Sequence, residues 1–110
     1  MKFILTNQKT HMKHFLILIT YKVDLTIIDS LLAKHREFLQ TGYDKNLLLL
    51  SGPENPRTGG VVIANANSLE EIKTFFCEDP YYKNAAAGYE FREFNPVKFQ
   101  PVLTDWMGGK

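Results

Sequence analysis

The most informative part of the chain is residues 15–41, which read FLILITYKVDLTIIDSLLAKHREFLQT. The first seven of these are aliphatic, β-branched or aromatic, and such a short run is typical of a strand. After Asp24, which can cap a helix N-terminus, apolar residues recur at the three-and-four spacing of one helix face. His35 falls among these apolar positions, which are Ile28, Leu31, Leu32, Phe38 and Leu39. The segment therefore predicts a strand followed by an amphipathic helix that turns a histidine inward.

His35 is the first candidate functional residue. A histidine that faces the interior has lost much of its water, so it needs a hydrogen-bond partner, and that partner influences its protonation. The chain offers a carboxylate in Asp79-Pro80-Tyr81, just past the end of a second predicted helix. A functional interpretation therefore depends on whether His35 and Asp79 meet.

The composition limits the class of protein. A chain of 110 residues, 45% hydrophobic and 23% charged, is expected to form one globular domain and not a disordered one. The net charge of +1 gives no electrostatic reason to expect nucleic acid or an anionic membrane as a partner, and no segment is long enough to span a bilayer. Because the lone Cys77 cannot form an internal disulfide, we expect a cytoplasmic, reducing location.

The expected domain boundaries follow from a change in composition near the N-terminus. Residues 1–11 look unlike the rest, and their apolar run is too short for the core of a signal peptide. We treat residues 1–11 as a leader, disordered or derived from cloning, with the native start at Met12. Residues 12–110 then form a single domain whose C-terminal tail begins at about residue 98.

Short apolar runs bounded by turn residues predict three further strands, at residues 47–50, 61–64 and 89–94. The first of these is expected to end at Ser51-Gly52-Pro53, and Gly59-Gly60 is expected to form a hairpin turn.

The predicted helices have recognisable start and stop signals. Gly42 is a natural end for the first helix. Ser68 and Glu71 form a capping box that opens a second helix, which Pro80 cannot continue. Residues 85–88 are predicted as a short helical turn closed by glycine.

The element order is βαββαβ, and the handedness of crossover connections then favours an α+β, ferredoxin-like sandwich. One four-stranded antiparallel sheet carries both helices on the same face. Three strands are apolar on both faces, whereas a sheet covered on one face usually alternates apolar with polar residues. A second copy, packed sheet against sheet about a twofold axis, is the economical cover for the other face. The alternative is that the tail, with Phe99, Leu103 and Trp106, folds over it.

His35 paired with Asp79 would suit proton transfer. An aspartate bonded to one imidazole nitrogen fixes the tautomer, leaves the other nitrogen as a base and stabilises the imidazolium that forms. No nucleophile is evident beside them, since Ser51 lacks the strained turn of a hydrolase serine and Cys77 is expected to pack inside the second helix. The chemistry that fits is isomerisation, elimination or lactone formation on a small acidic or phenolic molecule.

Five further residues are candidates for substrate binding, because they lie at strand ends or beside the aspartate: Ser51, Gly52, Pro53, Tyr81 and Tyr21. Gly52 would let a ligand approach the backbone closely, although Gly52-Pro53 can also be a plain turn. No cofactor or metal is expected. The sequence has no His-x-x-x-His spacing, no paired cysteines, no Gly-rich phosphate loop and no dinucleotide fingerprint.

Structural explanations compete with each functional one. A buried histidine often bonds a backbone carbonyl and nothing more, and Asp before Pro commonly caps the helix that follows. The protein could then be a non-catalytic dimer that binds a small ligand or serves as a scaffold. RNA binding is a third hypothesis, because the RRM fold has the same element order. The predicted strand at residues 61–64 has no aromatic residue on which a base could stack, which argues against it.

The order of these motifs resembles that of the YCII-related (YciI-like) family, from residue 12 to about residue 97. The shared pattern is an inward histidine in Lys34-His35-Arg36, a strand ending in Gly52-Pro53, and a capped helix ending in Asp79-Pro80-Tyr81 with Gly88 after it. The end of the fourth strand, Phe94-Asn95-Pro96-Val97, resembles the family's acidic strand that closes on proline and an aromatic residue, except that Val97 stands where the aromatic residue is usual. The resemblance implies a dimeric α/β-barrel related to muconolactone isomerase, with a pocket between helices and sheet. It also implies an active pair that matches His35 and Asp79. One branch of the family eliminates chloride from a chlorinated hydroxyquinol, so we expect a lyase, isomerase or dehydrochlorinase.

Overall fold

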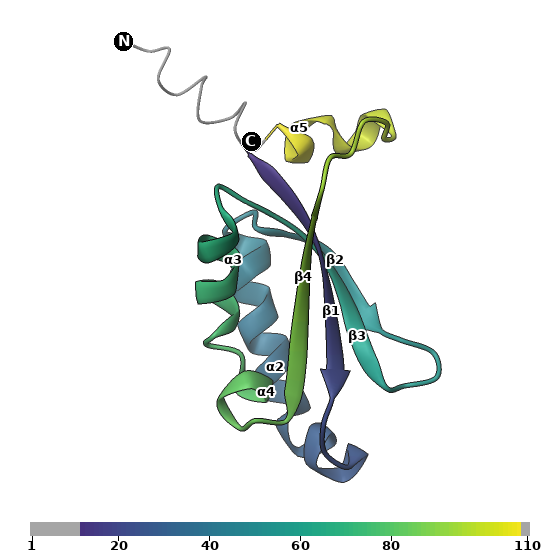
Figure 1. Cartoon of the computed structure of the whole chain (residues 1–110), viewed down its shortest axis with the longest axis vertical. Coiled ribbons are helices and arrows are strands. Elements are labelled where there is room, and N and C mark those ends of the chain that lie inside the picture. The colour runs from purple at the N-terminus through teal and green to yellow at the C-terminus, as the bar shows by residue number, and fades with distance from the viewer. Residues whose placement is uncertain (1–11, 109–110) are drawn as a thin grey trace.

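The ferredoxin-like sandwich predicted from the sequence is confirmed (Figure 1). The computed structural model describes residues 12–108, so the expected leader at residues 1–11 lies outside the described residues. The elements that form the sandwich are β1 (Lys13–Tyr21), α2 (Leu25–Asp44), β2 (Leu48–Pro53), β3 (Gly59–Ala66), α3 (Leu69–Phe76), α4 (Pro80–Lys83) and β4 (Ala87–Phe94). A 3₁₀ turn, η1 (Pro101–Leu103), and α5 (Thr104–Met107) follow. The antiparallel sheet has the strand order β2-β3-β1-β4.

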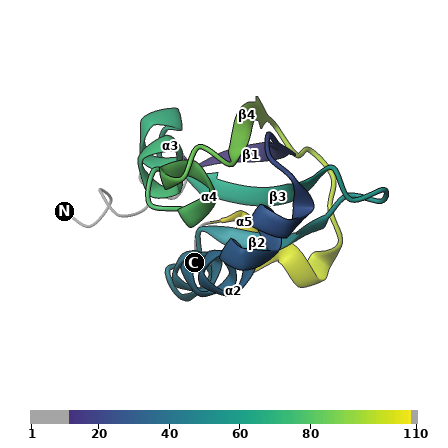
Figure 2. The ribbon, with the colours of Figure 1, turned by 90° about the horizontal axis from the view of Figure 1, so that it is seen from below.

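The core lies between the sheet and the helices. β1 alternates as a half-buried strand should, since Phe15, Ile17 and Ile19 point toward the helices and are at most 3% exposed. α2 packs beside β2, while α3 lies against β3 and β4 and α4 lies against β4 (Figure 2). On α2 the predicted apolar face is the buried one, with Ile28 and His35 inside. The inward orientation predicted for His35 is therefore confirmed.

The opposite face of the sheet, which we call the open face, carries aliphatic side chains that no helix covers. In the register of β1 with β3, Leu16 pairs with Ile63 and Leu18 with Val61, and paired residues share a face. Leu50 of β2, which also pairs with Ile63, is 55% exposed. Because these central positions are aliphatic, they lack the aromatic platform on which an RRM stacks bases.

The C-terminal tail covers only one end of the open face. Trp106 of α5 packs beside His14 near the start of β1, with the ring centroids 5.7 Å apart. Its carbonyl accepts a hydrogen bond from Asn65 Nδ2 at 3.0 Å. Phe99 stays 44% exposed, and α5 lies at one end of the sheet (Figure 1). Cover by the tail therefore does not extend to the aliphatic centre of the open face.

The prediction that Gly42 ends the first helix is wrong, because α2 continues to Asp44. Gly42 is buried, and a Cβ atom on it would lie 2.7 Å from the Phe75 ring and 2.8 Å from Leu48. The glycine therefore permits α2 to approach α3 and β2 closely. The chain leaves the helix at Asn46, whose φ of 62° lies in the left-handed region that asparagine tolerates.

Two local predictions at turns are also wrong. Residues 85–88 are not a helical turn, because the turn is α4, which begins at Pro80, and β4 already starts at Ala87. Gly59-Gly60 is not a hairpin turn, because it begins β3. In both cases pairing with a neighbouring strand overrides the local preference of glycine for turns. The predicted end of the second strand at Gly52-Pro53 is confirmed, because β2 ends at Pro53.

The ends of α3 differ from their prediction in two details. Ser68 Oγ accepts the Glu71 N–H at 3.0 Å as predicted, but Glu71 Oε1 accepts the N–H of Asn67, at 2.6 Å, in place of that of Ser68. Cys77 lies just after the helix and is exposed, so the expectation that it packs inside is wrong.

We expect the tail to undock as the pH falls, because His14 packs against it. Burial lowers the pKa of His14 below its usual 6.5, and a hydrogen bond with the Met107 backbone offsets this only in part. The docked state therefore binds fewer protons than the undocked one. Docking is favoured above pH 6.5 and is lost as the pH falls through the lowered pKa. Trp106 is the only tryptophan, so its fluorescence should shift to the red between about pH 7 and pH 5.

The His14→Gln variant keeps a polar side chain that does not titrate, and its emission should stay constant over the same range. A wild-type emission that does not change would contradict this expectation. So would a variant that shifts as much as the wild type.

Candidate functional site

The candidate site forms where α2 and α4 meet. His35 lies on the buried face of α2, and Asp79 is the residue that precedes α4. Nδ1 of His35 is 2.8 Å from Oδ1 of Asp79, although the two residues are 44 positions apart in the sequence. Only 8% of His35 is exposed, and none of Asp79. The two residues singled out in the sequence therefore do meet.

Asp79 is held by more than His35. Its Oδ1 also accepts the backbone N–H of Tyr81 at 3.0 Å, so it caps α4. Its Oδ2 accepts the Tyr89 hydroxyl at 2.6 Å. Donors from α2, α4 and β4 thus surround one buried carboxylate, as a buried charge requires. The capping role and the histidine contact, which were alternatives in the sequence, coexist in one side chain.

Sequence reasoning missed Tyr89. Burial, followed by the nearby charge of Asp79, raises the pKa of Tyr89 well above its usual 10, so the hydroxyl stays protonated and donates. The sequence could have indicated Tyr89 only through its position two residues before Phe91, which places both side chains on the inward face of the fourth strand. That signal fits any core residue equally well.

The contact with Asp79 orients the imidazole of His35. A carboxylate oxygen only accepts, so we assign the ring proton to Nδ1, and Nε2 keeps its lone pair. No residue within 12–108 bonds Nε2. The Tyr81 ring stacks on the imidazole, with centroids 3.9 Å apart and 10° between the planes. One hydrogen bond and one stacked ring therefore hold the histidine and leave Nε2 available to a ligand.

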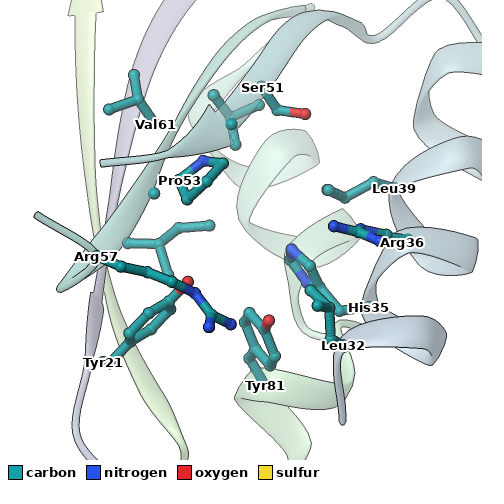
Figure 3. Close-up of a pocket in the computed structure, with 14 residues that line it drawn as sticks. Tyr21, Leu32, His35, Arg36, Leu39, Ser51, Pro53, Arg57, Val61 and Tyr81 are labelled. Atoms are coloured by element: carbon teal, nitrogen blue, oxygen red, sulfur yellow. The ribbon is translucent and has the colours of Figure 1, made fainter. Parts of the chain in front are cut away.

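A cavity of about 400 Å³ lies beside His35, between α2, α4 and the sheet (Figure 3). Six of the seven residues that the sequence suggested line it, namely Tyr21, His35, Ser51, Gly52, Pro53 and Tyr81. Asp79 does not line the cavity. It contacts Nδ1 of His35 through its own Oδ1. Much of the remaining wall is aliphatic, with Ile19, Leu32, Leu39 and Val62. Small-molecule pockets are commonly about 300–1,000 Å³, so this cavity is large enough for one ring-sized ligand.

Ser51 and Gly52 of the cavity wall differ in what surrounds them. Ser51 Oγ is 2.6 Å from the Tyr43 hydroxyl, so Ser51 is tied to α2 and not to His35. A Cβ atom on Gly52 would meet nothing within 4 Å, so the space beside this glycine is open. Ser51 can therefore contact a ligand but has no base beside it that would make it a nucleophile.

Sequence reasoning also missed two arginines that line the cavity. Arg36 follows His35 on α2, and Arg57 reaches in from the loop between β2 and β3 (Figure 3). Arg57 Nη2 bonds Asp29 Oδ1 at 2.6 Å, and its guanidinium carbon is 5.9 Å from the centre of the Tyr21 ring. The near-neutral net charge gave no sign of them, because only the fold brings both cations to one cavity.

The side chains of the site suit acid–base chemistry. No group of three His, Cys, Asp or Glu side chains within residues 12–108 is arranged to hold a metal ion. What the site does offer is an oriented imidazole with a free nitrogen, set among cationic and hydroxyl groups and facing an open cavity. This arrangement can move a proton to or from a bound small molecule.

Comparisons with known proteins agree with the fold. The sequence profile of the YCII-related domain matches residues 12–95. Among solved structures, the chain is similar to 5-chloro-2-hydroxyhydroquinone dehydrochlorinase (TftG) from Burkholderia phenoliruptrix AC1100, in complex with 2,5-dihydroxybenzoquinone. That match has 20% identity and a TM-score of 0.65, and covers 74% of this chain and 93% of the other.

A second solved structure is a mutant of SnoaB, a cofactor-independent oxygenase from Streptomyces nogalater. It has 13% identity and a TM-score of 0.48, over 83% of this chain and 98% of the other. A comparison with curated proteins found no match. At 20% identity the similarity to TftG supports the fold alone.

The Tyr89→Phe variant should have a free energy of unfolding about 1–3 kcal/mol lower than that of the wild type, because one oxygen of the buried Asp79 carboxylate loses its hydrogen-bond donor. Tyr82→Phe is the matched control, since Tyr82 is 52% exposed and its hydroxyl should matter by less than about 0.5 kcal/mol. Urea unfolding measures both variants. Equal and small effects would show that Tyr89 does not hold the carboxylate.

Proposed function

The chain belongs to the YCII-related domain family, and we propose that it is a small-molecule enzyme that transfers a proton through His35, with Asp79 as its partner. One observation carries the proposal. A fully buried carboxylate lies 2.8 Å from one nitrogen of a histidine whose ring lines an open cavity. An imidazole oriented in this way acts as a general base through its other nitrogen.

In the proposed reaction, Nε2 of His35 takes a proton from a carbon of the bound substrate. The Asp79 carboxylate stabilises the imidazolium that forms, while Nδ1–H keeps its hydrogen bond to Oδ1. In an elimination, the electron pair of the broken C–H bond forms the new double bond, and the leaving group departs with its own bonding pair. In an isomerisation, the imidazolium returns the proton to another atom of the substrate. Neither step needs an oxidant or a reductant.

The proposed substrate is a small acidic or phenolic molecule, and the reaction is of the lyase or isomerase type. Support comes from the cavity, whose aliphatic wall suits a ring and whose two arginines suit an anion. The structural neighbour TftG is a 5-chloro-2-hydroxyhydroquinone dehydrochlorinase, so dehydrochlorination is the first specific reaction to examine.

His35→Ala should lower turnover by about 10²–10⁴-fold, the usual contribution of a general base. Asp79→Asn should also reduce turnover, because it removes the charge that stabilises the imidazolium. Lys34→Ala, an exposed change on the same helix, is the matched control and should behave as the wild type. Chlorinated hydroquinones and unsaturated lactones form the substrate panel, with chloride release and ultraviolet absorbance as the measurements. Full activity in His35→Ala would contradict the proposal.

A non-catalytic dimer that binds a small ligand, or serves as a scaffold, is the second candidate function. It is favoured by the way His35 is held, because one hydrogen bond and one stacked ring would also describe a structural histidine. In that case His35→Gln would lower the melting temperature without changing ligand affinity, and no member of the panel would be turned over by the wild type.

We also propose that two copies pair through the open face. Leu16, Leu18 and Leu50 lie on that face without cover from a helix, and soluble monomers seldom leave such an area bare. A twofold axis would bury the same aliphatic residues of both copies at once.

Leu18→Glu should convert the dimer into a monomer, because it places a charge in the centre of the open face. Ile27→Glu is the matched control, since Ile27 is 46% exposed on α2 and lies away from the open face. Light scattering after size exclusion measures the mass. A wild type that runs as a monomer, or a Leu18→Glu variant that stays dimeric, would contradict pairing through this face.

We infer a reducing, cytoplasmic location from Cys77. Its thiol is free and exposed, and an oxidising compartment would tend to modify it. No helix within residues 12–108 is long and apolar enough to cross a membrane. Cell fractionation tests the location, and recovery from an oxidising compartment would contradict it.

A further inference from the structure

The Tyr81 hydroxyl is a buried polar group that has no partner among residues 12–108. Only 2% of Tyr81 is exposed, and its ring is fixed by stacking on His35. A buried hydroxyl without a hydrogen bond is unfavourable for stability, so its presence calls for a reason. In Figure 3 the hydroxyl points into the space bordered by Arg57 and His35. The hydroxyl therefore borders this cavity without a hydrogen bond from any of residues 12–108.

The charged groups of the cavity wall all have the same sign. Arg36 and Arg57 line it, and no aspartate or glutamate does. Arg57 bonds Asp29 through Nη2, which leaves other N–H groups of its guanidinium free to donate. The protein as a whole carries a net charge of only +1, so the positive wall is a local feature. An anion fits this wall better than a neutral or cationic ligand.

We propose that the Tyr81 hydroxyl and the Arg57 guanidinium form an oxyanion site, which holds the phenolate or enolate oxygen of the ligand while Nε2 of His35 faces its carbon skeleton. This inference rests on the proposed function in using the same cavity and base. Removal of a proton from a carbon next to a carbonyl or ring hydroxyl places negative charge on that oxygen. Donors aimed at it lower the barrier most when they are held in place before the reaction.

Tyr81 is suited to donate at this position. Burial, and then the nearby Tyr21 and Asp79, raise the pKa of Tyr81 to about 12, so the hydroxyl keeps its proton at neutral pH. The stacked geometry, with centroids 3.9 Å apart, fixes the hydroxyl relative to the imidazole. The base and the donor thus form one rigid wall, as expected for groups that act on neighbouring atoms of one ligand.

Tyr81→Phe separates this role from a structural one. The variant keeps the ring and its stacking, and it removes only a hydroxyl that bonds nothing within residues 12–108. The melting temperature should therefore stay the same or rise. If the hydroxyl instead stabilised the fold, its removal would lower the melting temperature.

The binding probe is 4-nitrophenol, whose anion is coloured, with nitrobenzene as a neutral ligand of similar shape. Wild-type protein should bind nitrophenolate more tightly than nitrobenzene, and the bound phenol should ionise at a lower pH than the free one. Tyr81→Phe and Arg57→Gln should each weaken nitrophenolate binding about tenfold and leave nitrobenzene binding unchanged. The matched controls are Tyr82→Phe and Lys83→Gln, which alter an exposed tyrosine and an exposed cation outside this cavity.

The outcomes separate this inference from the proposed function. Equal affinity of the wild type for both probes, no binding of nitrophenolate, or unchanged affinity in both variants would overturn the oxyanion site. Loss of turnover in His35→Ala together with any of these results would leave the proposed function standing. If nitrophenolate binding depends on Tyr81 and Arg57 but the protein turns over no substrate of the panel, the oxyanion site is supported and the proposed enzymatic function is contradicted. If Tyr81→Phe fails to fold, Arg57→Gln decides the outcome.

Discussion

The rest of the site depends on one buried carboxylate. Asp79 is fully buried, and a charge in that position is stable only while hydrogen-bond donors surround it. The donors come from His35 on α2, the N-terminus of α4 and Tyr89 on β4. The carboxylate therefore couples the position of the histidine to the packing of two helices against the sheet. The interaction that orients the imidazole is also one that holds these elements together.

The same arrangement explains the wall of the cavity. Pro80 suits the first turn of a helix because it has no N–H that needs a partner. Tyr81 follows it, gives its backbone N–H to Asp79 and stacks its ring on His35. Three consecutive residues thus cap a helix, orient a histidine and present a hydroxyl to the cavity. Displacement of one of them would displace the others, so the short segment Asp79-Pro80-Tyr81 carries much of the information about the site.

The sequence predicted the features that depend on local patterns. A short aliphatic and aromatic run identified β1, helical periodicity identified α2 and placed His35 inward, and the aspartate before a proline identified Asp79. Prediction failed where tertiary packing decides the outcome. Gly42 carries the local signal of a helix end, yet it lies inside α2, where its lack of a side chain admits α3. Arg57 carries no local signal, because its place in the cavity depends on the path of the loop between β2 and β3.

The central claim is that Asp79 keeps the ring proton of His35 on Nδ1 and leaves Nε2 unprotonated toward the cavity. NMR of protein labelled with ¹⁵N-histidine reports the protonation of each ring nitrogen, and spectra of His35→Gln assign the signals of His35. We predict that the neutral ring carries its proton on Nδ1 and that Nε2 has the chemical shift of an unprotonated nitrogen. A neutral ring with its proton on Nε2 would contradict the claim, because Asp79 would then not orient a base.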